Sequence, residues 1–98
     1  MPVKINTRNT KVSDKTKEHV EKVCEKLGQF SDRIIDCEVV LEKSKRRTAV
    51  EFIVKVPNQT LVGKAESEGD NLFKSIDDAG ERVERQLKKY QDKLLEHR

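Results

Sequence analysis

The feature that most constrains this chain is its C-terminal segment, residues 71–98, which has the pattern of one long amphipathic helix. Apolar residues recur there at alternating steps of three and four, the spacing that keeps side chains on one helical face. They are Leu72, Ile76, Ala79, Val83, Leu87, Tyr90 and Leu94. Asn71 or Asp70 is expected to cap the helix. Such a stripe needs a partner surface, which the rest of the chain must supply.

Charged residues are sorted along this helix and around it. Acids dominate its first turns, and bases dominate from residue 82 onwards. With an advance of about 100° per residue, four bases fall on one flank of the apolar stripe and several acids fall towards the other. The four bases, hereafter the helical basic row, are Arg82, Arg85, Lys89 and Lys93. The acids of the other flank are Asp77, Glu81 and Glu84.

Two explanations account for this row. Acids early and bases late complement the helix dipole, and Asp78 with Arg82 or Glu81 with Arg85 would form ordinary i,i+4 pairs. However, Lys89 has like-charge i,i+4 neighbours on both sides, each costing about 0.2 to 0.5 kcal/mol. The row is therefore either a solvated face or a face that binds anionic groups such as phosphates.

Size and composition predict one small folded domain spanning residues 1–98. Charged residues make up 40 %, but Val, Ile, Leu and Phe still number 26 of 98 and are periodically placed. The net charge of +3 favours local rather than general contact with nucleic acid. No apolar run approaches the length that spans a bilayer, so we expect a cytoplasmic protein without membrane contact. Cys24 and Cys37 lack metal-site spacing and are expected to be buried thiols, with a disulfide as the alternative.

The remaining elements follow from changes of period along the chain. Residues 3–8 alternate as a strand, and residues 14–27 form a helix capped by Ser13 and stopped by Gly28. Strands are expected at residues 34–43, with Ile35 among the inward side chains, at 49–56 and at 61–66, and residues 44–47 form a basic turn. The first helix carries its own basic flank, with Lys15, Lys22 and Lys26 beside His19.

The order β-α-β-β-β-α predicts an α+β fold in which two parallel helices cover one face of a four-stranded mixed sheet. One basic flank would then line the groove between the helices and the other its outer wall. The arrangement resembles double-stranded RNA-binding domains, which recognise phosphates and helical RNA shape. Most of the four aromatic residues, Phe30, Phe52, Phe73 and Tyr90, are expected in the core, which disfavours stacking on single-stranded bases.

No assembled nucleophile, base and acid, no phosphate-binding glycine loop and no cluster with metal-ligand spacing is recognisable. We therefore expect no enzyme activity, no cofactor and no small-molecule substrate. His19 and His97 are isolated in the sequence and are expected to be exposed residues without a role.

Several segments resemble the bacterial ribosome hibernation-promoting factor and ribosome-associated inhibitor A family, and the similarity spans nearly the whole chain. The most specific lies at residues 85–94, and the Phe-x-Asp-Arg-Ile stretch at residues 30–34 supports it. The other matching segments are 39–43, 68–69 and 75–77. The chain resembles the short form of the family, or a truncated long form, because it has neither an acidic tail nor a further C-terminal domain.

The resemblance implies a translation inhibitor that binds rRNA of the small subunit, within the 70S ribosome, in the mRNA and tRNA channel. Such proteins silence idle ribosomes under stress, as in stationary phase, and this one is expected to be a monomer when free. The implied rRNA-binding residues are Arg82, Arg85, Lys88, Lys89 and Lys93, with Lys22 and Lys26 of the first helix. Gln91 stands where the family often has a base, which removes one possible phosphate contact.

Two other functions are compatible with the residues alone. One is a double-stranded RNA-binding module without ribosome preference, which would bind generic duplexes as well as it binds small subunits. The other is a protein-interaction domain whose charged helices are only solvated, which would show no salt-dependent RNA binding.

Overall fold

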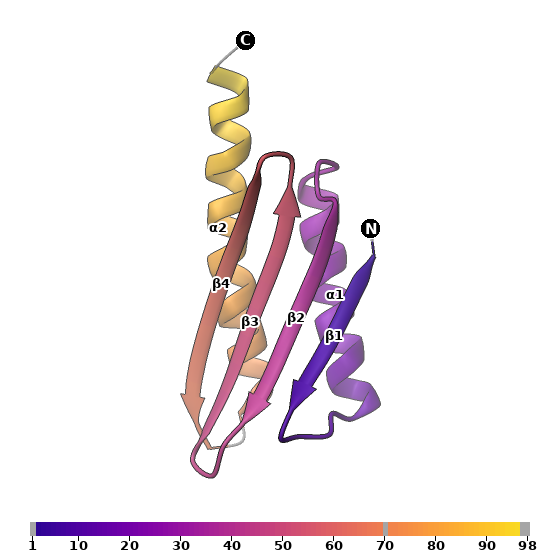
Figure 1. The fold of residues 1–98 in the computed structure, drawn as a ribbon, viewed down its shortest axis with the longest axis vertical. Coiled ribbons are helices and arrows are strands. Elements are labelled where there is room, and N and C mark those ends of the chain that lie inside the picture. The colour runs from indigo at the N-terminus through magenta and orange to yellow at the C-terminus, as the bar shows by residue number, and fades with distance from the viewer. Residues whose placement is uncertain (1, 70, 97–98) are drawn as a thin grey trace.

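The computed structural model describes residues 2–69 and 71–96. Two helices lie against one face of a four-stranded sheet, and the other face of the sheet is open (Figure 1). The element order is β-α-β-β-β-α, as predicted. The elements are β1 (Val3–Arg8), α1 (Asp14–Phe30), β2 (Asp36–Lys43), β3 (Arg47–Val56), β4 (Gln59–Glu68) and α2 (Leu72–Glu96).

The sheet is mixed, with its strands in the order in which they follow along the chain. β1 pairs parallel to β2, with Val3 opposite Cys37, and the remaining neighbours pair antiparallel. A parallel pair requires a long crossover, which α1 supplies, whereas tight turns join the antiparallel strands. Both helices therefore run in the same direction, as predicted (Figure 1).

The core lies between the sheet and the two helices. Alternate residues of β3 point into it, and Val50, Phe52, Val54 and Val56 are all buried. The apolar stripe of α2 covers this surface from the β4 side, and Val20, Cys24 and Leu27 of α1 cover it from the β1 side. The stripe predicted for α2 is confirmed at its central positions, Ile76, Ala79, Val83 and Leu87, which are buried.

Cys24 and Cys37 meet inside this core as free thiols, with 3.4 Å between their sulfur atoms. The hydrogen bond to Cys37, together with burial, raises the pKa of the Cys24 thiol. The prediction of buried, reduced cysteines is confirmed.

Two glycines allow α2 to approach β4 and α1 closely. A Cβ on Gly63 of β4 would lie 2.5 Å from the carbonyl oxygen of Ala79 and 2.7 Å from the nitrogen of Val83, both in α2. A Cβ on Gly80 of α2 would lie 2.6 Å from Cγ1 of Val23 in α1. The backbone of α2 is therefore seated directly on β4, and a side chain of α1 fills the space beside Gly80.

The predicted end of α1 was wrong. The helix continues through Gly28 to Phe30, and the Ser31 N–H donates to the Leu27 carbonyl oxygen at 3.1 Å. A glycine inside a helix costs only about 1 kcal/mol, and the additional turn has an external partner. The Gln91 side chain in α2 donates to the Phe30 carbonyl oxygen at 3.0 Å.

The prediction that Ile35 points inward was also wrong, because its side chain is 55 % exposed. β2 begins only at Asp36, and Ile34 packs against the core in its place. β4 is longer than predicted, with bounds at Gln59 and Glu68.

The predicted cap of the long helix is confirmed for Asn71, whose side-chain oxygen accepts the Lys74 N–H at 3.3 Å. The alternative cap, Asp70, and residues 97–98 lie outside the described residues. Within the described ranges, neither helix has the length and apolar character needed to cross a membrane.

Candidate nucleic-acid interface

The helical basic row lies along the outer edge of the sheet, beside β4. The Arg82 guanidinium donates to the carbonyl oxygen of Lys64 in β4. One turn further along α2, the Gln86 side chain accepts the Val62 N–H at 3.3 Å and donates to the Val62 carbonyl oxygen. These contacts fix the rotation of α2, so the flank that carries the row faces the β4 edge and solvent.

All four side chains of the row belong to exposed residues. Arg85 makes an i,i+4 ion pair with Glu81 at 3.8 Å, but both side chains are more than half exposed, and such pairs contribute little. Lys89 and Lys93 form no ion pair with any other described residue. The predicted pair of Asp78 with Arg82 does not form, because the Arg82 guanidinium is bound to the β4 backbone instead.

Lys88 is exposed but does not belong to the row. It lies about 100° further round the helix than Lys89, towards the solvent-facing side. Together, Lys88 and the row make the middle and C-terminal turns of α2 a strongly cationic surface.

The basic flank of α1 has a different setting. His19, Lys22 and Lys26 line the groove between the helices, and Asp77, Glu81 and Glu84 of α2 line the same groove. His19 Nε2 lies 2.7 Å from Asp77 Oδ1, and Lys26 Nζ lies 3.9 Å from Glu84 Oε2. The α1 flank thus lines the groove and faces carboxylates, while the helical basic row lies on the outer wall.

His19 was wrongly predicted to be without a role. Besides its contact with Asp77, its ring lies 4.8 Å from the Phe73 ring, measured between centroids. His19 therefore joins the first turns of α2 to the middle of α1. Its position on the basic flank was recognisable from the sequence, but its partner lies 58 residues away in the chain.

The contacts of Gln86 and Gln91 were not predicted from the sequence. Gln86 binds β4, and Gln91 closes the end of α1. Both are amides on the flanks of the apolar stripe of α2, where a side chain can both donate and accept hydrogen bonds. Their position on these flanks was the only feature of the sequence that could have indicated such contacts.

The aromatic residues are less buried than predicted. Phe52 is buried and Tyr90 is half-buried, with its hydroxyl donating to the Pro57 carbonyl oxygen at 3.1 Å. Phe30 and Phe73, however, are 41 % and 45 % exposed. Among residues 2–69 and 71–96, no group of three or more His, Cys, Asp or Glu could hold a metal ion.

Comparison with known proteins places this arrangement among ribosome-associated proteins. Residues 3–95 match the family described as sigma 54 modulation protein / S30EA ribosomal protein. The ribosome hibernation promoting factor of Escherichia coli K12 is 30 % identical over 97 residues, which cover 99 % of this chain and all of that factor. The ribosome hibernation promotion factor of Deinococcus radiodurans is 29 % identical over 99 residues, and this chain spans only 51 % of its length.

A solved structure supports the same assignment. The ribosomal subunit interface protein from Coxiella burnetii superposes with a TM-score of 0.85 at 26 % sequence identity. The superposition covers 94 % of this chain and 99 % of that one. The chain therefore belongs to the sigma 54 modulation protein / S30EA family of ribosome hibernation factors.

Proposed function

We propose that residues 1–98 act as one ribosome-binding domain that occupies the mRNA and tRNA channel of the small subunit and so blocks translation under stress. The observation that carries this proposal is the exposed helical basic row, in which Lys89 and Lys93 have no ion-pair partner among the described residues of this member of the hibernation factor family. The protein acts in the cytoplasm, on the small subunit or the 70S ribosome, as a monomer when free. It needs no cofactor and catalyses no reaction.

Phosphate contacts supply the affinity in this mechanism. Lys89 and Lys93 lie one helical turn apart, and their mutual repulsion is relieved when anions lie beside them. Binding to rRNA releases condensed counterions, so the logarithm of the affinity falls by about 0.9 per log unit of salt for each phosphate neutralised on a duplex. Inhibition then follows from steric overlap with mRNA and tRNA.

The α1 bases contribute less to binding in this proposal. Lys26 already faces Glu84, and Lys22 lines the same acid-containing groove. Part of any attraction to phosphate is therefore cancelled by neighbouring carboxylates. Lys88, which is exposed on α2 itself, ranks with the row.

The test compares two double charge reversals in co-sedimentation with small ribosomal subunits. Arg85→Glu with Lys89→Glu changes the row, and Lys4→Glu with Lys17→Glu is the control, since these two exposed lysines lie on β1 and on the N-terminal part of α1. Both variants have the same net charge. We expect the row variant to be lost from the pellet at moderate salt and the control to sediment as the wild type does.

Equal sedimentation of the two variants would contradict the proposal. If wild type bound generic RNA duplexes as tightly as small subunits, a double-stranded RNA-binding module without ribosome preference would be the better description. If wild type showed no salt-dependent RNA binding, the charged helices would be only solvated.

A further inference from the structure

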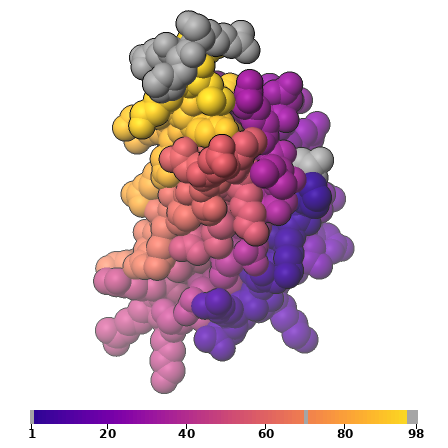
Figure 2. Space-filling model, turned by 45° about the horizontal axis from the view of Figure 1, so that its top comes forward, coloured from indigo at the N-terminus to yellow at the C-terminus, as the bar shows by residue number. Residues whose placement is uncertain are grey.

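A second group of cations gathers at the end of the sheet where β1, β2 and β4 end and β3 begins. We call it the basic end; it comprises Arg8, Lys11, Lys45, Arg46 and Arg47. These residues come from the end of β1, the loop before α1, and the β2–β3 turn with the first residue of β3. All five are exposed. The magenta segment that contains the β2–β3 turn projects from the lower end of the molecule (Figure 2).

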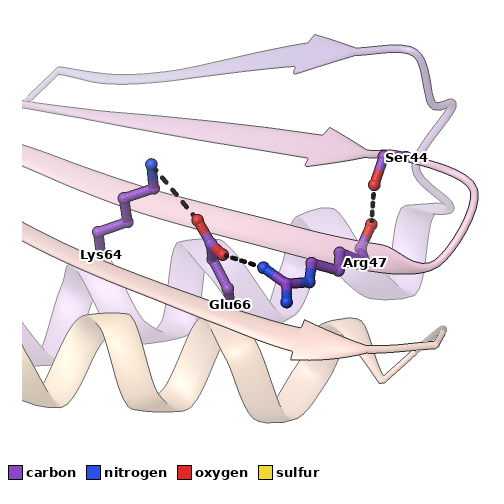
Figure 3. Close-up of polar contacts among 4 residues, drawn as sticks. All are labelled: Ser44, Arg47, Lys64 and Glu66. Atoms are coloured by element: carbon purple, nitrogen blue, oxygen red, sulfur yellow. Dashed lines mark hydrogen bonds and ion pairs between the residues drawn. The ribbon is translucent and has the colours of Figure 1, made fainter.

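The backbone of the β2–β3 turn is held firmly. The Ser44 N–H and hydroxyl both donate to the Arg47 carbonyl oxygen, at 2.8 and 3.3 Å, and Figure 3 shows the hydroxyl contact. Gly69 N–H donates to the Arg46 carbonyl oxygen at 3.0 Å, and the Thr48 hydroxyl donates to the Gly69 carbonyl oxygen at 2.7 Å. The turn is thus fastened to the segment that leads into α2, while its side chains remain in solvent.

The fold brings the other two bases to this turn. Arg8 lies opposite Glu42 in the parallel register, two residues before the turn begins. Lys11 lines a hollow at the same end of the sheet together with Thr48 and Leu72. Residues far apart in sequence therefore share one end of the molecule.

Two carboxylates lie near this charge, Glu42 opposite Arg8 and Glu68 opposite Arg47, but neither makes an ion pair with the five bases. Arg47 lies 3.4 Å from Glu66, but Lys64 lies 3.6 Å from the same carboxylate, so two cations share one anion (Figure 3). Arg8, Lys11, Lys45 and Arg46 make no ion pair with any other described residue. The conformation of the β2–β3 turn does not require Lys45 and Arg46, because tight turns favour Gly, Asn, Asp, Pro or Ser rather than Lys and Arg.

The basic end is separate from the helical basic row. Along α2, at about 1.5 Å per residue, Leu72 beside the basic end is about 15 Å from Arg82, the nearest member of the row, and about 25 Å from Lys89. The acids Asp77 and Asp78 lie on the helix between them. Because the Debye length is about 8 Å at physiological salt, the two groups do not attract the same phosphate.

We infer that the basic end is a second phosphate-binding site that holds the RNA backbone at a point distinct from the one held by the helical basic row. This inference rests on the proposed function and deepens it. The domain would bridge two RNA segments, with α2 as the rigid spacer. Arg46 and Arg47 suit this role, since a guanidinium can donate two parallel hydrogen bonds to one phosphate.

The first experiment measures affinity for isolated small ribosomal subunits as a function of salt. Lys45→Gln with Arg46→Gln removes two charges from the basic end, and Lys4→Gln with Lys17→Gln is the matched control. We expect the salt slope to fall by about one to two units and the affinity to fall about tenfold at physiological salt. Combination with Arg85→Gln and Lys89→Gln is expected to give additive losses in the logarithm of affinity.

The second experiment identifies the contacted macromolecule. An iron chelate is attached at Ser44→Cys or, in a separate protein, at Asp92→Cys beside the row, while the buried Cys24 and Cys37 stay unlabelled. Hydroxyl radicals are expected to cut rRNA at one segment from position 44 and at another from position 92.

The outcomes separate the two proposals. The proposed function would be overturned if the chelate at position 92 cut no rRNA and if the affinity of the wild type did not depend on salt. Normal binding and cleavage from position 92 would leave the proposed function intact. In that case, an unchanged salt slope for the Lys45 and Arg46 variant, with no cleavage from position 44, would overturn the inference and indicate a protein neighbour or solvent at the basic end.

Discussion

Residues that look equivalent in the sequence have different roles in the folded protein. Arg82 and Lys89 both belong to the helical basic row, and both are exposed. The Arg82 guanidinium is hydrogen-bonded to the backbone of β4, whereas Lys89 has no ion-pair partner among the described residues. Arg82 therefore contributes to the fold as well as to the charge of the surface, and Lys89 contributes to the charge alone.

This difference predicts separable effects of two alanine substitutions. Arg82→Ala is expected to lower the free energy of unfolding by about 1 kcal/mol, the net value of one hydrogen bond. Lys89→Ala is expected to leave it within about 0.5 kcal/mol of wild type, as for surface substitutions without special contacts. Urea denaturation measures both effects, and salt-dependent binding to small subunits is expected to weaken in both variants. Equal stability of the two variants would show that the Arg82 contact contributes nothing.

At the scale of elements, the position of α2 depends on how closely it approaches β4. Gly63 leaves room for the backbone of α2, because a Cβ there would meet backbone atoms of Ala79 and Val83. The neighbour of Gly80 is instead a methyl group of Val23 at the end of a side chain. Backbone cannot move without shifting the whole helix, whereas at Gly80 only one side chain has to shift, although a valine in a helix strongly prefers a single rotamer.

The two glycines therefore predict unequal costs. Gly63→Ala is expected to destabilise the fold by about 1 to 3 kcal/mol, the usual range for overpacking. Gly80→Ala is expected to cost less, because only the Val23 side chain has to shift and because alanine is favoured over glycine in a helix by about 1 kcal/mol. Thermal denaturation of the two variants under the same conditions gives the comparison. A larger loss of stability for Gly80→Ala would mean that Val23 in α1 shifts less readily than the backbone of α2.

The elements themselves were predictable from local periodicity. Alternation of period two identified β3 with its four inward apolar side chains, and the steps of three and four identified α2. The errors arose where a distant residue decided the outcome. Gly28 stays helical next to a turn held by Gln91, which is more than sixty positions away, and Phe73 lies against His19, more than fifty positions away, instead of in the core.

For the candidate site, the position of the helical basic row was predictable from the sequence, but the contacts of its side chains were not. A helical step of about 100° sufficed to place the row on one flank of α2. It did not show that Arg82 and Gln86 bind the β4 backbone, because that depends on which edge of the sheet α2 covers. It also did not bring Lys11 and Arg46 to the same end of the molecule, since only the folded topology does so.

At the scale of the whole molecule, the domain is long and narrow, with extents of 49 × 22 × 18 Å. The last turns of α2 extend beyond the sheet (Figure 1), and cations are placed both on this helix and at the opposite end. A body of this shape can lie lengthwise in an RNA channel and exclude other occupants along it.

The proposed occupation of the mRNA and tRNA channel predicts competition with bound tRNA. Small subunits loaded with mRNA and initiator tRNA are expected to bind the protein less well than empty ones. With tRNA at ten times its own Kd, mutually exclusive binding raises the apparent Kd of the protein about tenfold. Equilibrium binding of fluorescently labelled protein measures the shift, and an RNA hairpin in place of tRNA is the control. An unchanged Kd would mean that both ligands occupy the subunit together.

The contacts that Arg82 and Gln86 make with β4 have a consequence for self-association. An outer strand with free N–H and carbonyl groups is a template on which another chain can add a strand, the first step towards aggregates. Here the outward groups of Val62 and the carbonyl of Lys64 are already occupied by side chains of the same molecule. This stretch of β4 is therefore closed to strand addition by a second copy of the protein.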